Sequence, residues 1–198
     1  MLQPERFKDY GPNGLQVEGR PEIRKIVSSV TASRALIEAA IAAGADAVFV
    51  HHGLFWRGQD GCVTGWMKQR LALLLAHDVN LFAYHLPLDA HPELGNNAQL
   101  GAKLKLVADG RFGEQDLGFI GAPEKPLTAA ALAALLQFRL GRAPTLVEGD
   151  GRPLKRVVKL DPNAAQAMKW VAPRELRDHE MPPADVVLVD RLIERSAA

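Results

Sequence analysis

The chain has 198 residues, 47% of them hydrophobic, which is enough to bury the core of one large domain or of a domain and a half. Its formal net charge of +1 is spread along the chain, which argues against a nucleic-acid arm, a membrane-surface helix or another membrane partner. One cysteine, Cys62, excludes an internal disulfide framework and a cysteine-based metal cage. No apolar run approaches a membrane span and residues 1–6 carry no apolar signal core, so we expect a cytoplasmic protein.

Residues 9–17 are dense in turn formers. Gly11-Pro12 and Asn13-Gly14 are strong loop signals. Two interpretations are open. The segment is a plain surface turn, or it is a shaped loop that closes over a site and offers Asn13 and Gln16 as uncharged polar contacts.

A β-α-β unit follows. We expect a strand over 25–30, a helix over 34–43 capped by the hydroxyl of Thr31 or Ser33, and a second strand over 47–51. Gly44 has the residue type that usually ends a helix. The connection between the two strands should be right-handed.

The second strand ends at two adjacent histidines, His51 and His52. Its apolar run is typical of a buried parallel strand, and such strands end in loops that hold ligands. The pair therefore indicates a metal site. An equally supported alternative is that one histidine is packed and the other is solvated.

A glycine-rich loop over 53–65 leads to a helix over 66–77 and a strand over 80–85. This third strand also ends on a histidine, His85. The next segment, 86–97, contains two prolines that restrict its backbone, and Asn96 or Asn97 is expected to cap a helix that runs to about 105.

We expect His51, His52 and Asp89 to be metal ligands, since parallel strand ends meet at one edge of a sheet. Adjacent strand residues point to opposite faces, so His51 and His52 would reach two neighbouring ions rather than one. His85 is the candidate catalytic residue, and it could instead ligate or orient a ligand. Two ions would polarise a substrate oxygen and supply hydroxide at neutral pH. Imidazole and carboxylate together suit zinc, iron, manganese or nickel.

The second half carries weaker signals. They predict a strand over 117–121, a helix over 128–140, and a hairpin that joins 145–148 to 155–160. Beyond it we expect a short helix over 162–170, an exposed charged segment over 173–180 and a last strand over 185–190. His91 and Glu93, in the loop after Asp89, are expected to be solvated.

Three segments, 9–19, 44–56 and 83–97, resemble in order the motifs of a dinuclear-metal family known as GTP cyclohydrolase 1 type 2, or Ngg-interacting-factor-three-like. The resemblance implies an α/β fold with a mostly parallel sheet and helices on its faces. It implies two related halves, here 1–110 and a shorter, divergent 111–198, and hexameric rings of identical subunits. Two divalent metals per chain are implied, with His51 on one and His52 and Asp89 on the other.

The resemblance also implies a hydrolase that opens the ring of a purine nucleotide such as GTP. The family completes its site with a C-terminal histidine followed four residues later by a bridging glutamate. No His-x-x-x-Glu spacing occurs after Val158, where the one histidine, His179, directly precedes Glu180. His91, Glu93, His179 or Glu180 would have to substitute. The alternatives are therefore a non-catalytic metal-binding or assembly protein of the same family, and a truncated member with an incomplete site.

Overall fold

A computed structural model describes residues 1–147, 152–154 and 157–159. The chain separates into two compact units, Met1–His91 and a second that begins at Pro92. The elements in chain order are the 3-10 turn Pro4–Arg6, β1 Gly14–Val17, β2 Ile26–Thr31, α1 Arg34–Ala42, β3 Ala47–His52, α2 Gly65–Ala76, β4 Asn80–Ala83, α3 Leu86–Asp89, α4 Asn96–Lys103, β5 Leu106–Phe112, the 3-10 turn Glu114–Asp116, β6 Gly118–Pro123, α5 Ala129–Leu140 and β7 Val157–Lys159.

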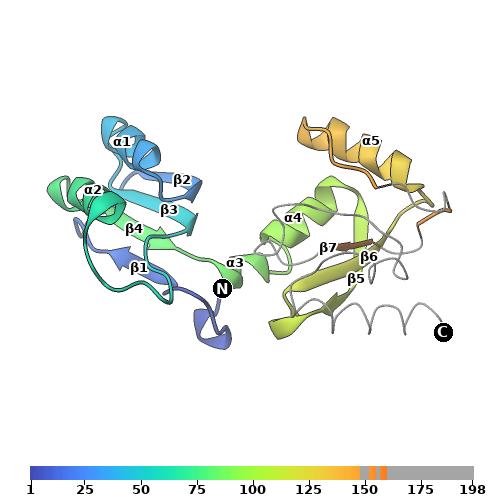
Figure 1. Ribbon diagram of the computed structural model, residues 1–198, viewed down its shortest axis with the longest axis horizontal. Helices are drawn as coiled ribbons and strands as arrows, with labels where there is room; N and C mark the ends of the chain where they lie inside the picture. Colours follow the sequence, from blue (N-terminus) through green and yellow to red (C-terminus); the bar gives the residue numbers. More distant parts are fainter. Residues whose placement is uncertain (148–151, 155–156, 160–198) are drawn as a thin grey trace. The chain divides into compact units, whose positions relative to one another are not determined.

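The first unit is built on a four-stranded sheet with the strand order β1-β4-β3-β2 (Figure 1). β2, β3 and β4 run parallel, and β1 pairs antiparallel with β4. This mixed sheet confirms an α/β fold with a mostly parallel sheet in the first unit. Because β3 and β4 are parallel neighbours, whatever follows their C-terminal ends lies at the same edge.

Two helices cover this sheet. α1 begins where Ser33 Oγ accepts a hydrogen bond from Leu36 N at 3.2 Å, as one of the two predicted caps. It ends before Gly44, whose φ of +69° suits glycine. α1 and α2 contact each other, and their buried faces join the strands in one core. Its fully buried members include Ile37, Val48, Val50, Leu74 and Leu81.

The two central strands end close to their predicted positions. β3 extends one residue further, to His52, and β4 ends at Ala83, two residues before His85. Phe49 of β3 stacks on Tyr84 with a centroid separation of 5.8 Å. The register of β3 with β4 pairs Val50 with Ala83, which brings His51 beside the residues that follow β4.

The expectation that 9–17 is entirely a loop was wrong. Residues 14–17 form β1, which pairs with β4 through a register shift between Leu15 and Val17. A strand of four residues beside strong turn signals has little periodicity of its own, so pairing with β4 decides its conformation. The segment 86–97 also contains a helical turn, α3, and α4 is capped by Gly95 rather than by an asparagine side chain.

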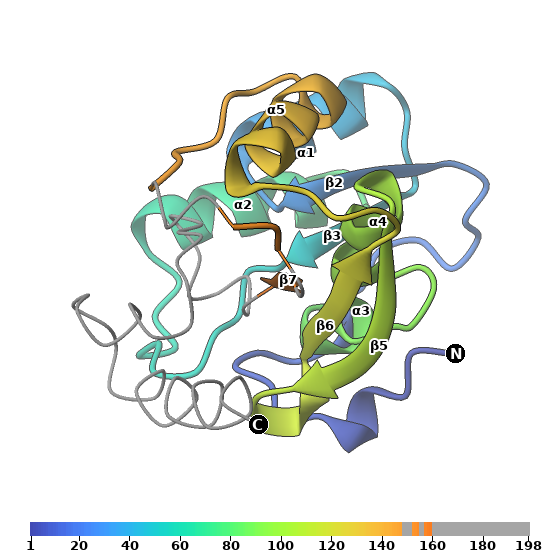
Figure 2. The same cartoon turned by 90° about the vertical axis from the view of Figure 1, so that its right-hand side faces the viewer.

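In the second unit the described strands form an antiparallel sheet in the order β5-β6-β7 (Figure 2). β6 and α5 agree with the predicted strand and helix, and Thr128 Oγ1 caps α5 by accepting from Ala131 N at 3.2 Å. Leu132 and Leu136 of α5 pack with Leu104 and Val157 in a separate small core.

The sequence did not predict β5. Its Asp109-Gly110 pair reads as a turn, but the structure places there a register shift against β6, between Ala108 and Gly110. The predicted domain boundary after residue 110 falls inside this strand. The predicted hairpin is wrong in its described part, because residues 145–147 form no strand and β7 pairs with β6.

The predictions for 162–170, 173–180 and 185–190, together with His179 and Glu180, concern residues outside those that the structure describes. Within the described residues, no helix combines the length and apolar character that crossing a bilayer requires.

Replacing Ile37 by alanine tests the core of the first unit. Ile37 is fully buried, so Ile37→Ala should lower the free energy of unfolding by about 2–5 kcal/mol through lost burial and a residual cavity. Leu75→Ala is the control, because Leu75 is 59% exposed on α2 and should change stability by less than about 0.5 kcal/mol. Urea unfolding followed by circular dichroism measures both. Equal losses of unfolding free energy in Ile37→Ala and Leu75→Ala would contradict the assignment of Ile37 to the core.

Candidate metal centre

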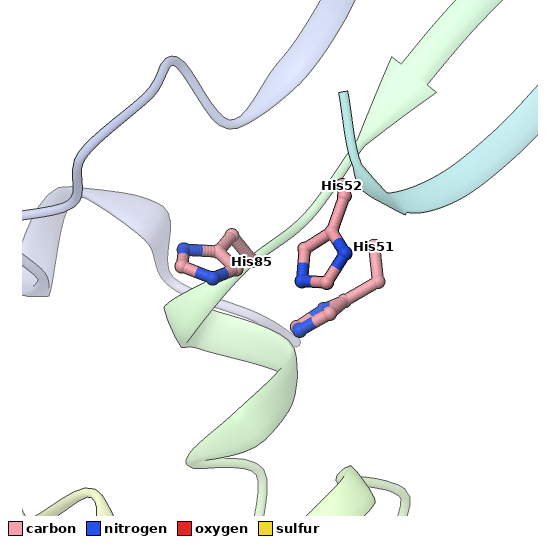
Figure 3. A group of neighbouring side chains, drawn as sticks. All are labelled: His51, His52 and His85. Atoms are coloured by element: carbon pink, nitrogen blue, oxygen red, sulfur yellow. The ribbon is translucent and has the colours of Figure 1, made fainter. Parts of the chain in front are cut away.

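Three histidines meet at the C-terminal edge of the parallel strands (Figure 3). His51 and His52 end β3, and His85 follows β4. Their ring centroids lie 4.6 Å apart for His51 and His52, 4.9 Å for His51 and His85, and 5.6 Å for His52 and His85. One ring nitrogen of each lies within 4.8 Å of the other two. The expected convergence of strand-end histidines is therefore confirmed.

The hydrogen bonds of His51 determine which of its nitrogens is available. Its Nδ1 lies 3.0 Å from the backbone oxygen of Tyr84, and a carbonyl only accepts, so Nδ1 carries the proton. The other nitrogen, Nε2, is buried, makes no hydrogen bond and lies 3.3 Å from Asp89 Oδ2. When the His51 ring is neutral, Nε2 turns a lone pair toward the Asp89 carboxylate, an arrangement that a cation between or beside them would stabilise.

Asp89 comes from α3, the helical turn that follows His85. Its carboxylate is completely buried, with an exposed fraction of 0%. The turn is closed by Asp89 N donating to His85 O at 3.1 Å. α3 therefore delivers the predicted carboxylate beside the histidines.

His85 is held by Asp9, a residue that the sequence analysis did not single out. His85 Nδ1 donates to Asp9 Oδ1 at 2.7 Å, and both side chains are buried. Burial raises the pKa of Asp9, but hydrogen bonds from His85, from Asn13 and from the backbone N–H of Leu86 outweigh it and lower the pKa to about 2. Asp9 is thus ionised at neutral pH, so His85 keeps its proton on Nδ1 and leaves Nε2 as the nitrogen able to ligate.

The loop before β1 packs directly against the site. Asn13 Nδ2 donates to Asp9 Oδ2 at 2.8 Å, and Asn13 Oδ1 accepts from His85 N at 2.8 Å. Gln16 Oε1 accepts from Leu54 N at 2.9 Å. A side chain at Gly53 would collide with Gln16. Residues 9–13 therefore form a shaped loop against the histidine cluster, whereas Gln16 lies in β1 and contacts Leu54.

His52 is the most exposed of the three. Its Nδ1 lies 3.2 Å from Thr31 Oγ1 of β2. Desolvation lowers its pKa, and the neighbouring His51 and His85 lower it further, while Asp89 acts in the opposite direction. The neutral imidazole, which is the form that binds metal, is therefore favoured.

Trp56 forms an aromatic wall beside the cluster. Its ring meets His85 edge-on at 5.1 Å and lies 6.0 Å from His52. Trp56 lies in the predicted glycine-rich loop over 53–65, and its contacts with the histidines were not predicted. Cys62, in the same loop, is exposed.

The residues fit a divalent metal. Three imidazoles beside a carboxylate form a donor set that zinc, iron, manganese and nickel accept. Nitrogens about 2.0–2.1 Å from one ion lie at most about 4.2 Å apart. A spread of up to 4.8 Å therefore requires a small ring rotation around one ion, or two neighbouring ions as predicted. His91 is half-buried and Glu93 is exposed; neither belongs to this histidine cluster.

The sequence and the fold are similar to those of known proteins. The family model Duf34/NIF3 (NGG1p interacting factor 3) matches residues 1–164. A protein of Neisseria meningitidis serogroup B named "GTP cyclohydrolase 1 type 2 homolog" is 53% identical over 156 residues, which are 79% of this chain and 63% of that protein. A protein of the same name from Escherichia coli K12 is 50% identical over 152 residues, 77% of this chain and 60% of that protein.

A solved structure of protein ybgI, described as of unknown function, is 47% identical to this chain with a TM-score of 0.75. The match covers 79% of this chain and 63% of that one. The chain thus spans a little over three fifths of the length of the relatives that it matches.

Asp9→Asn tests how the histidine cluster is supported. Because the folded pKa of Asp9 lies below its unfolded value of 3.8, its stabilisation is fully present above about pH 4 and is lost as the pH falls toward 2. The shift corresponds to about 2 kcal/mol. Asp9→Asn in metal-free protein should remove this part of the acid sensitivity, which urea unfolding at pH 2.5 and 5 measures. Asp60→Asn, at an exposed loop position, is the control, and identical pH profiles for Asp9→Asn and wild type would contradict the assignment.

Proposed function

Because the chain belongs to the Duf34/NIF3 (NGG1p interacting factor 3) family, we propose that its histidine cluster binds divalent metal and that the metal-bound protein hydrolyses a purine nucleotide such as GTP. The observation that carries the metal site is the convergence of three ring nitrogens within 4.8 Å, with a buried carboxylate 3.3 Å from one of them. The nucleotide rests on the names of the relatives and on the resemblance of the three motifs.

The ligands would be His51, His52, His85 and Asp89. In each histidine, Nδ1 already has a partner. For His51 it is the Tyr84 carbonyl, for His52 the Thr31 hydroxyl and for His85 the Asp9 carboxylate. Nε2 is therefore the nitrogen that each ring offers to the metal. We propose His85 as a third imidazole ligand; its predicted role as the catalytic residue would require its Nε2 to be left for proton transfer.

A divalent ion held there would polarise a substrate oxygen and lower the pKa of water. The protein's own groups prepare that chemistry. The ionised Asp9 keeps the His85 ring in one tautomer and raises its basicity. Trp56 covers the side of His85 with an apolar ring and limits access of bulk water there.

A second candidate function is a metal-binding or assembly protein without turnover. A substrate-activating ion needs ligands that leave room for a substrate and a base that accepts a proton. The four residues above supply ligands, whereas none of them is free to serve as that base.

We also propose that the second unit is related to the first, that the subunits form hexameric rings, and that the protein is cytoplasmic. Exposed apolar side chains on β2, Ile26 at 60% and Val30 at 62%, support a subunit contact. Sedimentation velocity of the purified chain tests the assembly.

The metal content of the purified chain tests the site. After reconstitution with Zn²⁺ or Mn²⁺ and desalting, elemental analysis should find one to two ions per chain. His52→Ala and His85→Ala should each weaken binding at least about tenfold, as loss of a metal-site residue usually does. His77→Ala is the matched control, because His77 is exposed at the end of α2. A wild-type chain that binds no metal would overturn the proposal, and full binding by His85→Ala would return His85 to its predicted catalytic role.

Ring opening of GTP tests the activity. With metal bound, product detected by mass spectrometry should accumulate, and a chelator or the double change His51→Ala plus His52→Ala should reduce its rate to the uncatalysed background. Stoichiometric metal with no turnover would establish the second candidate function. Turnover that persists in the double variant would contradict both.

A further inference from the structure

Arg57 is an exposed cation at the rim of the histidine cluster, and the proposed metal chemistry does not use it. It follows Trp56, whose ring lies 5.1 Å from the ring of His85. Its Nη2 donates to the backbone oxygen of Asp9 at 2.9 Å, and the carboxylate of the same Asp9 accepts from His85 Nδ1 at 2.7 Å. The guanidinium is therefore separated from the cluster by two hydrogen bonds and the width of one residue.

Further contacts hold the Arg57 side chain in place. Its backbone N–H donates to Tyr10 O at 2.6 Å, and its guanidinium carbon lies 5.6 Å from the centre of the Tyr10 ring. A guanidinium over an aromatic ring is attracted by a cation–π interaction. A side chain at Gly11 would collide with Phe55 O, so the loop that carries Tyr10 packs closely on the chain that leads to Arg57. An arginine ordered in this way loses less conformational entropy when it binds a ligand.

Among the residues that the structure describes, no carboxylate pairs with Arg57. Arg20, Arg24 and Arg34, by comparison, each form an ion pair with an acidic side chain. A guanidinium has five N–H donors, and the Asp9 carbonyl takes one of those of Arg57. The rest are left for a ligand, and a planar fork of N–H groups matches the oxygens of a phosphate.

We propose that Arg57 binds the 5′-phosphates of a nucleotide whose base lies at the histidine cluster. This inference rests on the proposed function, because it assumes a nucleotide at the metal. The metal would contact the reacting end of the substrate, whereas a fixed guanidinium beside it would distinguish a nucleotide from its nucleoside. The separation is suitable, since one ribose joins the base of a nucleotide to its 5′-phosphates and one residue joins Arg57 to the cluster.

Calorimetric titration of GTP and of guanosine into the zinc-loaded 198-residue chain tests this inference. GTP should bind more tightly than guanosine. Arg57→Gln should weaken GTP binding at least about tenfold, because charge-assisted hydrogen bonds are lost, and should leave guanosine binding unchanged. Arg57→Lys should recover only part of the loss, because lysine keeps the charge without the planar fork. Lys68→Gln is the matched control, since it removes one positive charge at an exposed position of α2 and should bind GTP like the wild type.

Two further measurements distinguish a binding role of Arg57 from a structural one. Because Arg57 is exposed, Arg57→Gln should keep the metal content and the melting temperature of the wild type. Where ring opening of GTP is observed, Arg57→Gln should raise KM and leave kcat nearly unchanged, as loss of an interaction made equally by substrate and transition state does.

Equal affinity of the wild type for GTP and guanosine would overturn the inference. Unchanged GTP affinity in Arg57→Gln would also overturn it and would assign the phosphates to the metal itself. The outcomes separate this inference from the proposed hydrolysis. GTP that is bound through Arg57 and is not opened would contradict the hydrolysis alone, whereas GTP that Arg57→Gln opens with the KM of the wild type would contradict the role of Arg57 alone.

Discussion

The parallel pairing of β3 with β4 is the constraint on which the candidate site depends. The register sets Val50 beside Ala83, so the residues that follow these two positions lie together at the C-terminal edge of the parallel strands. His51 then lies against the backbone oxygen of Tyr84, which fixes its protonated nitrogen, and His85 comes next along the chain. A slip of one residue would move the side chains of either strand to the opposite face and separate the histidines.

The loop before β1 gives this edge its second layer of contacts. The buried, ionised Asp9 is acceptable there because His85, Asn13 and the backbone of Leu86 all donate to it. A buried charge without such donors would instead be neutralised or would destabilise the fold. The same segment becomes β1 a few residues later, so an edge strand of the sheet and the support of His85 are one continuous piece of chain.

The sequence alone determined the β-α-β unit, α2 and α5, because apolar strand runs, leucine-rich helical segments and the hydroxyl caps of α1 and α5 are local signals. It also placed His51, His52 and His85 at strand ends, where parallel topology predicts convergence. Tertiary structure decided β1 and β5, which are short or interrupted by turn-forming residues and form through pairing with β4 and β6. It alone decided the contact of Asp9 with His85, since the two residues are 76 positions apart and no local pattern links them.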